Sequence, residues 1–249
     1  MSAVIETRDL CMRFGALTVA EKINFSLAPG DRHALIGPNG AGKTTFVNLL
    51  TGRLAPSSGR VFLGGKDVTA LSQSARVKRG LGRTFQINTL FREMCVLDNV
   101  ALGIAERRGL SGRLWRPACA HAAVREEATD LLASLGIADE AARRVVDLPY
   151  GKQRLVEIAI ALGLRPTVLL LDEPAAGVPS LESERILRAL DGLPAEIAIL
   201  VIEHDMDLVF RFARRITVLV QGEILCEGSP EEIAGDERVQ RVYLGERHA

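Results

Sequence analysis

The chain has 249 residues, of which 47% are hydrophobic, and its 31 basic side chains are balanced by 31 acidic ones. This length suits one large α/β domain, or a core with a smaller subdomain attached. A net charge of zero argues against nucleic acid as a partner, and four scattered cysteines without C-x-x-C spacing argue against a disulfide framework or a zinc site.

The first quarter of the chain is predicted to be mostly β structure. It begins MSAVIETRDL, which lacks the apolar core of a signal peptide. INFSL at 23–27 alternates apolar and polar residues, as a half-buried antiparallel strand does, and HALIG at 33–37 indicates a buried strand. Gly64 and Gly65, within RVFLGGKDV, predict a hairpin or a tight turn.

Helices are predicted from about residue 100 to 164, where Ala, Leu, Arg and Glu dominate. In EEATDLLASLG, apolar residues recur at helical spacing before Gly136, which stands at a helix stop. TVLLLDEP and EIAILVIEH then indicate central parallel strands, with a helix SLESERILRAL between them and strands RITVLV and GEILCEG after them. The apolar runs are too short to span a membrane, so we expect any membrane association to depend on a partner.

GPNGAGKTT, at residues 37–45, fits the pattern G-x-x-x-x-G-K-[ST] between an apolar strand and a helix. Glycines let the backbone turn so that its N–H groups form an anion-binding nest at the helix N-terminus. We expect Lys43 to reach the β- and γ-phosphates of a nucleotide and the Thr44 hydroxyl to coordinate Mg²⁺. The predicted nucleotide-binding residues here are Gly37, Pro38, Asn39, Gly40, Ala41, Gly42, Lys43, Thr44 and Thr45.

Two carboxylates end the apolar run VLLLDEP. Asp172 would stand at the carboxyl end of a parallel strand, where α/β proteins bind ligands, so we expect it to hold Mg²⁺ directly or through water. Glu173 would face the γ-phosphate and act as general base toward the attacking water. An ordinary strand capped by a polar turn is the alternative; the phosphate loop favours the nucleotide site.

Further motifs follow in the order that is typical of the ATP-binding cassette (ABC) family of transporter ATPases, and nearly the whole chain resembles that family. GRTFQ resembles the Q-loop, LPYGKQR the signature motif and AGVPSLES the D-loop. The resemblance implies that Gln86 completes Mg²⁺ coordination and senses the γ-phosphate. It also implies that His204 contacts the γ-phosphate and that Phe14 stacks on adenine.

The signature stretch departs from the family's LSGGQ, because Pro149, Tyr150 and Lys152 replace serine, glycine and glutamine. Losing the serine hydroxyl removes a hydrogen bond to a charged group, which costs about 1.5–3 kcal/mol. Gly151 and the start of the following helix remain, and Lys152 could add positive charge, so we expect a working but altered site. The D-loop also lacks the family's common aspartate, and Glu182 lies nearby.

The resemblance implies an α/β fold: a P-loop NTPase (RecA-like) core with an antiparallel β subdomain and an α-helical subdomain. A single ABC ATPase domain would span 1–249, with the core and β subdomain at about 1–86 and 165–249 and the helical subdomain at about 87–164. Two copies, or one copy and a homologue, would enclose ATP between the phosphate loop of one and Gly151 of the other. The resemblance also implies two integral membrane permease subunits as partners and, indirectly, a periplasmic solute-binding protein. The chain would then lie in the cytoplasm, bound to the inner face of the membrane through the permease subunits.

Several stretches are similar to the branched-chain amino acid importers of this family: RTFQINTLFREMCVLDNVALG, the signature variant with tyrosine, IEHDMDLVF and EGSPEEIAGDERVQRVYLGE. An insertion that contains Trp115 is also typical of that subgroup. Amides, urea or aromatic acids remain alternative substrates. The altered signature also leaves open a non-hydrolysing ATP-dependent switch, whereas a DNA-repair or translation ATPase would usually carry a second cassette or a long coiled coil.

Overall fold

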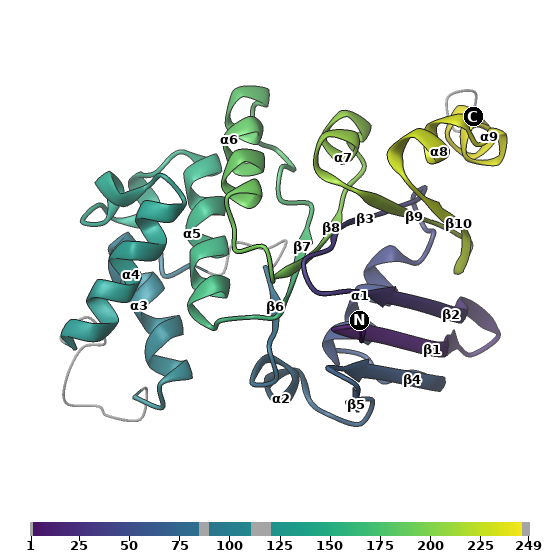
Figure 1. Cartoon of the computed structure of the whole chain (residues 1–249), viewed down its shortest axis with the longest axis horizontal. Helices are drawn as coiled ribbons and strands as arrows, with labels where there is room; N and C mark the ends of the chain where they lie inside the picture. The colour runs from purple at the N-terminus through teal and green to yellow at the C-terminus, as the bar shows by residue number, and fades with distance from the viewer. Residues whose placement is uncertain (1, 85–89, 111–120, 246–249) are drawn as a thin grey trace.

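A computed structural model describes residues 2–84, 90–110 and 121–245. Helices α3 to α6 gather at one end of the molecule and a small antiparallel sheet lies at the other, with the central strands between them (Figure 1). This arrangement confirms the predicted mixture of a parallel α/β core, an antiparallel sheet and a helical region.

The central sheet has six strands in the order β10-β9-β3-β8-β7-β6. All neighbouring strands pair in parallel except β9 and β10, which are antiparallel. Strands β3, β7 and β8 are buried along their whole length, which explains the apolar runs of β7 and β8; β3 also buries Arg32 and His33. The strands are β3 (Arg32–Ile36), β6 (Leu81–Arg83), β7 (Val168–Asp172), β8 (Ala198–Ile202), β9 (Arg215–Val220) and β10 (Glu223–Gly228).

The second sheet is antiparallel, with the order β2-β1-β4-β5. Gly64 and Gly65, with φ of 55° and 74°, form the predicted tight turn between β4 and β5. Burial alternates at the end of β2, as INFSL indicated. The strands are β1 (Ile5–Phe14), β2 (Leu17–Leu27), β4 (Ser58–Leu63) and β5 (Lys66–Asp67).

Helix α1 (Lys43–Thr51) follows β3 through the loop at 37–42 and packs between the two sheets. Its Phe46 is buried and meets Phe25 of β2 edge to face, with ring centroids 5.4 Å apart. Leu35 faces this layer, whereas Ala34 and Ile36 face the core on the opposite side of the sheet. The sheet therefore buries both faces, and α1 is held rigidly beneath the loop.

The core on the other face of the sheet is built with helices. Helix α4 ends at Ser134, and Gly136 follows with φ of 69°, as the stop signal predicted. In the described part of the chain, no helix combines the length and the apolar character needed to cross a membrane. The remaining helices are α2 (Gln73–Val77), α3 (Val96–Arg107), α4 (Ala122–Ser134), η2 (Ala138–Glu140), η3 (Val145–Asp147), α5 (Tyr150–Gly163), α6 (Ser180–Asp191), α7 (Met206–Phe212), α8 (Pro230–Gly235) and α9 (Glu237–Gly245).

Candidate functional site

Two glycines of the 37–45 loop are required by their surroundings as well as by their dihedral angles. A Cβ on Gly42, which has φ of 100°, would lie 2.6 Å from the carbonyl oxygen of Val19. A Cβ on Gly37 would lie 2.1 Å from the carbonyl oxygen of Leu219. Both distances are far shorter than a van der Waals contact, so β2 and β9 hold the loop backbone closely on two sides.

Lys43 crosses the loop that precedes it. Its Nζ donates to the carbonyl oxygens of Gly37 at 2.5 Å and Pro38 at 2.9 Å. Helix α1 begins at Lys43 with Gly42 as its N-cap, which has no side chain to bond the first N–H groups. An anion at this end would therefore meet backbone donors, the positive end of the helix dipole and an ammonium group. Thr44, the predicted Mg²⁺ ligand, is exposed at the same end.

The ends of β7 and β8 bring three predicted residues together, because Asp172 pairs in register with Ile202. Glu173 follows with φ of 48°, an uncommon value for a residue other than glycine, and its N–H donates to the Ile202 carbonyl at 2.9 Å. The Nδ1 atom of His204 lies 4.0 Å from Oε1 of Glu173. Such local backbone strain is typical of functional sites, and here it places a half-buried carboxylate beside an exposed imidazole.

Asp172 is paired with an arginine to which the sequence analysis gave no role. Arg83, the last residue of β6, donates from Nη2 to Oδ2 of Asp172 at 2.9 Å. Its Nη1 donates to Oδ1 of Asn48 on α1, also at 2.9 Å. A charged residue in the short strand before the Q-loop was the available sequence signal.

Glu203 is a second residue that the sequence analysis missed. Its side chain is buried at the end of β8 and accepts the N–H groups of Ala175 at 3.2 Å and His204 at 3.3 Å. Burial raises the pKa of this carboxyl above its ordinary value, and the two N–H groups oppose the rise. The carboxyl ties the turn after Glu173 to the segment that carries His204. Its position directly after an apolar strand was a signal in the sequence.

The predicted signature helix, α5, begins at Tyr150 after Pro149. The N–H of Gly151 donates to Oε2 of Glu182 at 3.1 Å, so a carboxylate of the D-loop region occupies this donor within one chain. The ammonium of Lys152 bonds the carboxylate of Glu140, which compensates the positive charge that we expected it to add.

Several predicted residues lie on open surface. Phe14 ends β1 with 49% of its surface exposed, which leaves a ring face accessible for stacking. The side chain of His204 is 67% exposed, and Thr44 is also exposed. Gln86 and Trp115 lie outside the described residues. Phe14, Thr44 and His204 are thus open to solvent, whereas Asp172 is buried and Glu173 is half-buried.

The donor set suits a hard cation held partly by phosphate. Among the residues that the structure describes, no group of three or more His, Cys, Asp or Glu side chains could hold a metal. Mg²⁺ commonly takes one or two protein oxygens and fills its other positions with phosphate and water oxygens. The Asp172 carboxylate and the Thr44 hydroxyl fit that requirement at a phosphate-binding loop.

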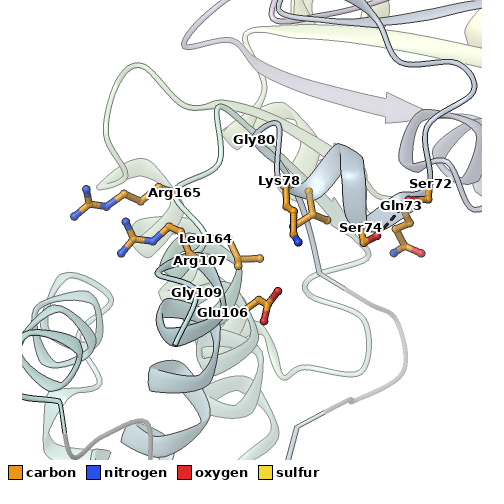
Figure 2. Close-up of a pocket in the computed structure, with 11 residues that line it drawn as sticks. Ser72, Gln73, Ser74, Lys78, Gly80, Glu106, Arg107, Gly109, Leu164 and Arg165 are labelled. Atoms are coloured by element: carbon orange, nitrogen blue, oxygen red, sulfur yellow. Dashed lines mark hydrogen bonds between the residues drawn. The ribbon is translucent and has the colours of Figure 1, made fainter. Parts of the chain in front are cut away.

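A separate groove of about 930 Å³ lies between α2 and the ends of α3 and α5. Figure 2 shows Ser74 and Lys78 on one side of it, and Glu106, Arg107 and Arg165 on the other. The three cationic side chains outnumber the single carboxylate in this set. The groove contains none of the predicted nucleotide-binding residues.

Comparisons with known proteins agree with the geometry. A family model described as "ABC transporter" matches residues 20–176, and one described as "Branched-chain amino acid ATP-binding cassette transporter" matches residues 223–249.

Two curated relatives match the chain along 98% of its length and 98% of theirs. The high-affinity branched-chain amino acid transport ATP-binding protein LivG of Escherichia coli K12 is 39% identical over 254 residues. The corresponding BraF of Pseudomonas aeruginosa is 36% identical over 252 residues. The solved ADP conformation of MJ1267, an ATP-binding cassette of an ABC transporter, is 30% identical with a TM-score of 0.87, and the match covers 98% of this chain and all of that one.

Proposed function

Because the chain belongs to the ABC transporter family and is an ATPase of it, we propose that it powers the import of branched-chain amino acids. The observation that carries the proposal is the phosphate loop at the N-terminus of α1, with Asp172 and Glu173 ending the strand β7. The substrate class is supported by LivG, by BraF and by the C-terminal family match at 223–249.

In the proposed reaction, the backbone N–H groups of the loop and the Lys43 ammonium bind the β- and γ-phosphates. For Lys43 this means exchanging the carbonyls of Gly37 and Pro38 for phosphate oxygens. Thr44, Asp172 and Gln86 would hold Mg²⁺, which supplies positive charge that neutralises the phosphates. Glu173 takes a proton from the attacking water, and His204 donates a hydrogen bond to the γ-phosphate.

A second copy, or a homologous subunit, completes the site in this proposal. One chain presents Lys43 and Glu173, both half-buried, and it carries Gly151 at the start of a separate helix. Head-to-tail pairing would cover the nucleotide and exclude water, which strengthens each electrostatic interaction there. Gly151 would then exchange the Glu182 carboxylate for the phosphate of the opposite site.

We place the transporter's membrane subunits at the groove between α2 and the helical region (Figure 2). Lys78 would suit an acidic or helix C-terminal group of a cytoplasmic loop. Arg107 and Arg165, which already bond the carboxylate of Glu127, would add positive charge to the rim of the groove. Two permease subunits would hold the ATPase at the inner face of the membrane, and a periplasmic binding protein would deliver the solute.

Glu173→Gln tests the proposed reaction, because it keeps the shape of the side chain but removes the base. ATP binding should persist while phosphate release falls by about 10²–10⁴-fold. Glu184→Gln serves as a matched control, because this half-exposed carboxylate of α6 pairs with Arg211, and it should hydrolyse ATP like the wild type. Unchanged turnover in Glu173→Gln would exclude Glu173 as the base, and an absence of Mg²⁺-dependent turnover in the wild type would exclude hydrolysis itself.

Radiolabelled leucine uptake into cells that express the chain with its membrane subunits tests the substrate class. Uptake should require ATP and should be lost with Lys43→Ala, because the ammonium that binds the phosphates is gone. Competition by unlabelled isoleucine and valine, but not by urea or an amide, is expected. Stronger competition by urea, by an amide or by an aromatic acid would reassign the substrate.

A further inference from the structure

Arg83 occupies a central position between three elements of the proposed site. It ends β6, pairs with Asp172 at the end of β7 and bonds Asn48 on α1. These elements are neighbours in the fold, since β6 pairs with β7 and α1 carries the phosphate-binding N-terminus. Arg83 therefore links β6 to β7 and to α1 within the core of the nucleotide site.

The ion pair between Arg83 and Asp172 is shielded from water. Only 7% of the Arg83 side chain and 3% of the Asp172 side chain are exposed. A guanidinium is planar and holds its N–H donors in a fixed fork, so two bonds in different directions determine its orientation. Asp172 accepts from Nη2, whereas Nη1 donates to the amide oxygen of Asn48 and, at 3.5 Å, to the hydroxyl of Thr51. Asn48, which makes the shorter of these two α1 contacts, therefore helps to set the direction from which Arg83 meets the carboxylate.

This pairing leaves the carboxylate of Asp172 oriented for a second ligand. Arg83 bonds Oδ2, so Oδ1 is the oxygen that can face Mg²⁺ or a water bound to it. A carboxylate that ligates a metal is commonly held by such an outer hydrogen bond, which fixes its rotation. Without Arg83, the carboxylate would be buried with no compensating charge and free to turn.

We infer that Arg83 is a positioning residue for Mg²⁺ binding: it orients Asp172 and is itself oriented by Asn48. The inference rests on the proposed function, in which Asp172 holds the cation. Arg83 contacts neither nucleotide nor metal in this assignment. It acts on the cation through the Asp172 carboxylate, so its loss should weaken the response to Mg²⁺ and leave Mg²⁺-free nucleotide binding intact.

The test measures the affinity for a fluorescent ATP analogue while Mg²⁺ is varied, and the binding of Mn²⁺ by electron paramagnetic resonance in the presence of ADP. In Arg83→Gln the concentration of cation at half-saturation should rise by about 10–100-fold in both assays. Binding of the analogue in EDTA should match the wild type. Arg83→Lys keeps the charge but not the fork, so its shift should be intermediate.

Asn48→Ala provides a second, milder variant, because it removes the shorter bond of Arg83 Nη1 without touching Asp172 and leaves the longer bond to the Thr51 hydroxyl, at 3.5 Å. It should shift the cation midpoint in the same direction, and it decides the question if Arg83→Gln does not fold. Arg76→Gln is the matched control. Arg76 is also a buried arginine beside the last turn of α1, but it bonds the backbone carbonyls of Leu49 and Leu50 and not the carboxylate of Asp172. This control should lower stability and leave the midpoint unchanged.

The inference would be overturned if the cation concentration at half-saturation in Arg83→Gln stayed within about twofold of the wild-type value. It would also be overturned if that concentration fell, since Arg83 would then have competed with the cation. The same result in Arg76→Gln as in Arg83→Gln would also overturn it, since any buried arginine would then suffice. Failure of the proposed function is recognised separately, because the wild type itself would then show no Mg²⁺-assisted affinity for ATP.

Discussion

His33, in the strand that leads into the phosphate loop, makes stability depend on pH. The side chain is buried between Phe25, whose ring meets it edge to face at 5.1 Å, and Thr217. The Thr217 hydroxyl donates to Glu227 at 3.0 Å, so it accepts from Nε2–H of a neutral imidazole at 2.7 Å. Nδ1 has no hydrogen-bond partner among the described residues, and a proton there would be buried without an acceptor.

Burial lowers the pKa of His33 from 6.5 to about 4, against the opposing effect of the nearby Glu227 and Asp31 carboxylates. The unfolded chain therefore takes up this proton first as the pH falls, so stability is lost on acidification from about pH 7 to about pH 4. At about pH 5 the imidazole is about 97% protonated in the unfolded chain and about 9% in the folded protein. The difference removes about 2 kcal/mol of unfolding free energy between about pH 7.5 and about pH 5.

Urea unfolding of the wild type and of His33→Gln at both pH values measures this contribution. The variant should lose about 2 kcal/mol less than the wild type on acidification, whatever its absolute stability. Comparing the two proteins cancels the contributions of other titratable groups to the pH dependence. These include Glu157 and Glu203, whose pKa values are raised by burial and which therefore stabilise the folded protein on acidification, opposite to His33. His121→Gln, at the start of α4, is the control. Equal acid sensitivity in the wild type and His33→Gln would refute the assignment to His33.

Two substitutions test the two halves of the nucleotide site. Gly42→Ala should displace the phosphate loop, because its Cβ would lie 2.6 Å from the Val19 carbonyl oxygen, and we expect ATP affinity to fall by at least about tenfold; calorimetry that finds wild-type affinity would show that the loop adapts. Glu182→Ala releases the N–H of Gly151 for the phosphate of a second molecule, so ATP-induced dimers should form at about 3–10-fold lower protein concentration in sedimentation experiments. Weaker dimers would instead indicate that Glu182 supports the interface.

Local sequence determined the elements and the main motifs. Continuous apolar runs predicted β7 and β8 because a strand covered on both faces has no polar side, and Gly64 and Gly65 predicted their turn because only a few residues adopt positive φ easily. The phosphate loop was recognisable because its glycines, lysine and threonine all lie within residues 37–45, so a short local pattern contains the whole loop.

Tertiary structure alone decided the pairings between distant residues. Arg83 and Asp172 are 89 positions apart and meet because β6 and β7 are neighbours in the sheet, an order that no local pattern encodes. Gly151 is bonded by Glu182, and Lys152 by Glu140, because α5 packs beside α6 and the η2 segment. Secondary-structure propensity depends on a few neighbouring residues in the sequence, whereas these contacts depend on how all the elements of the core pack together.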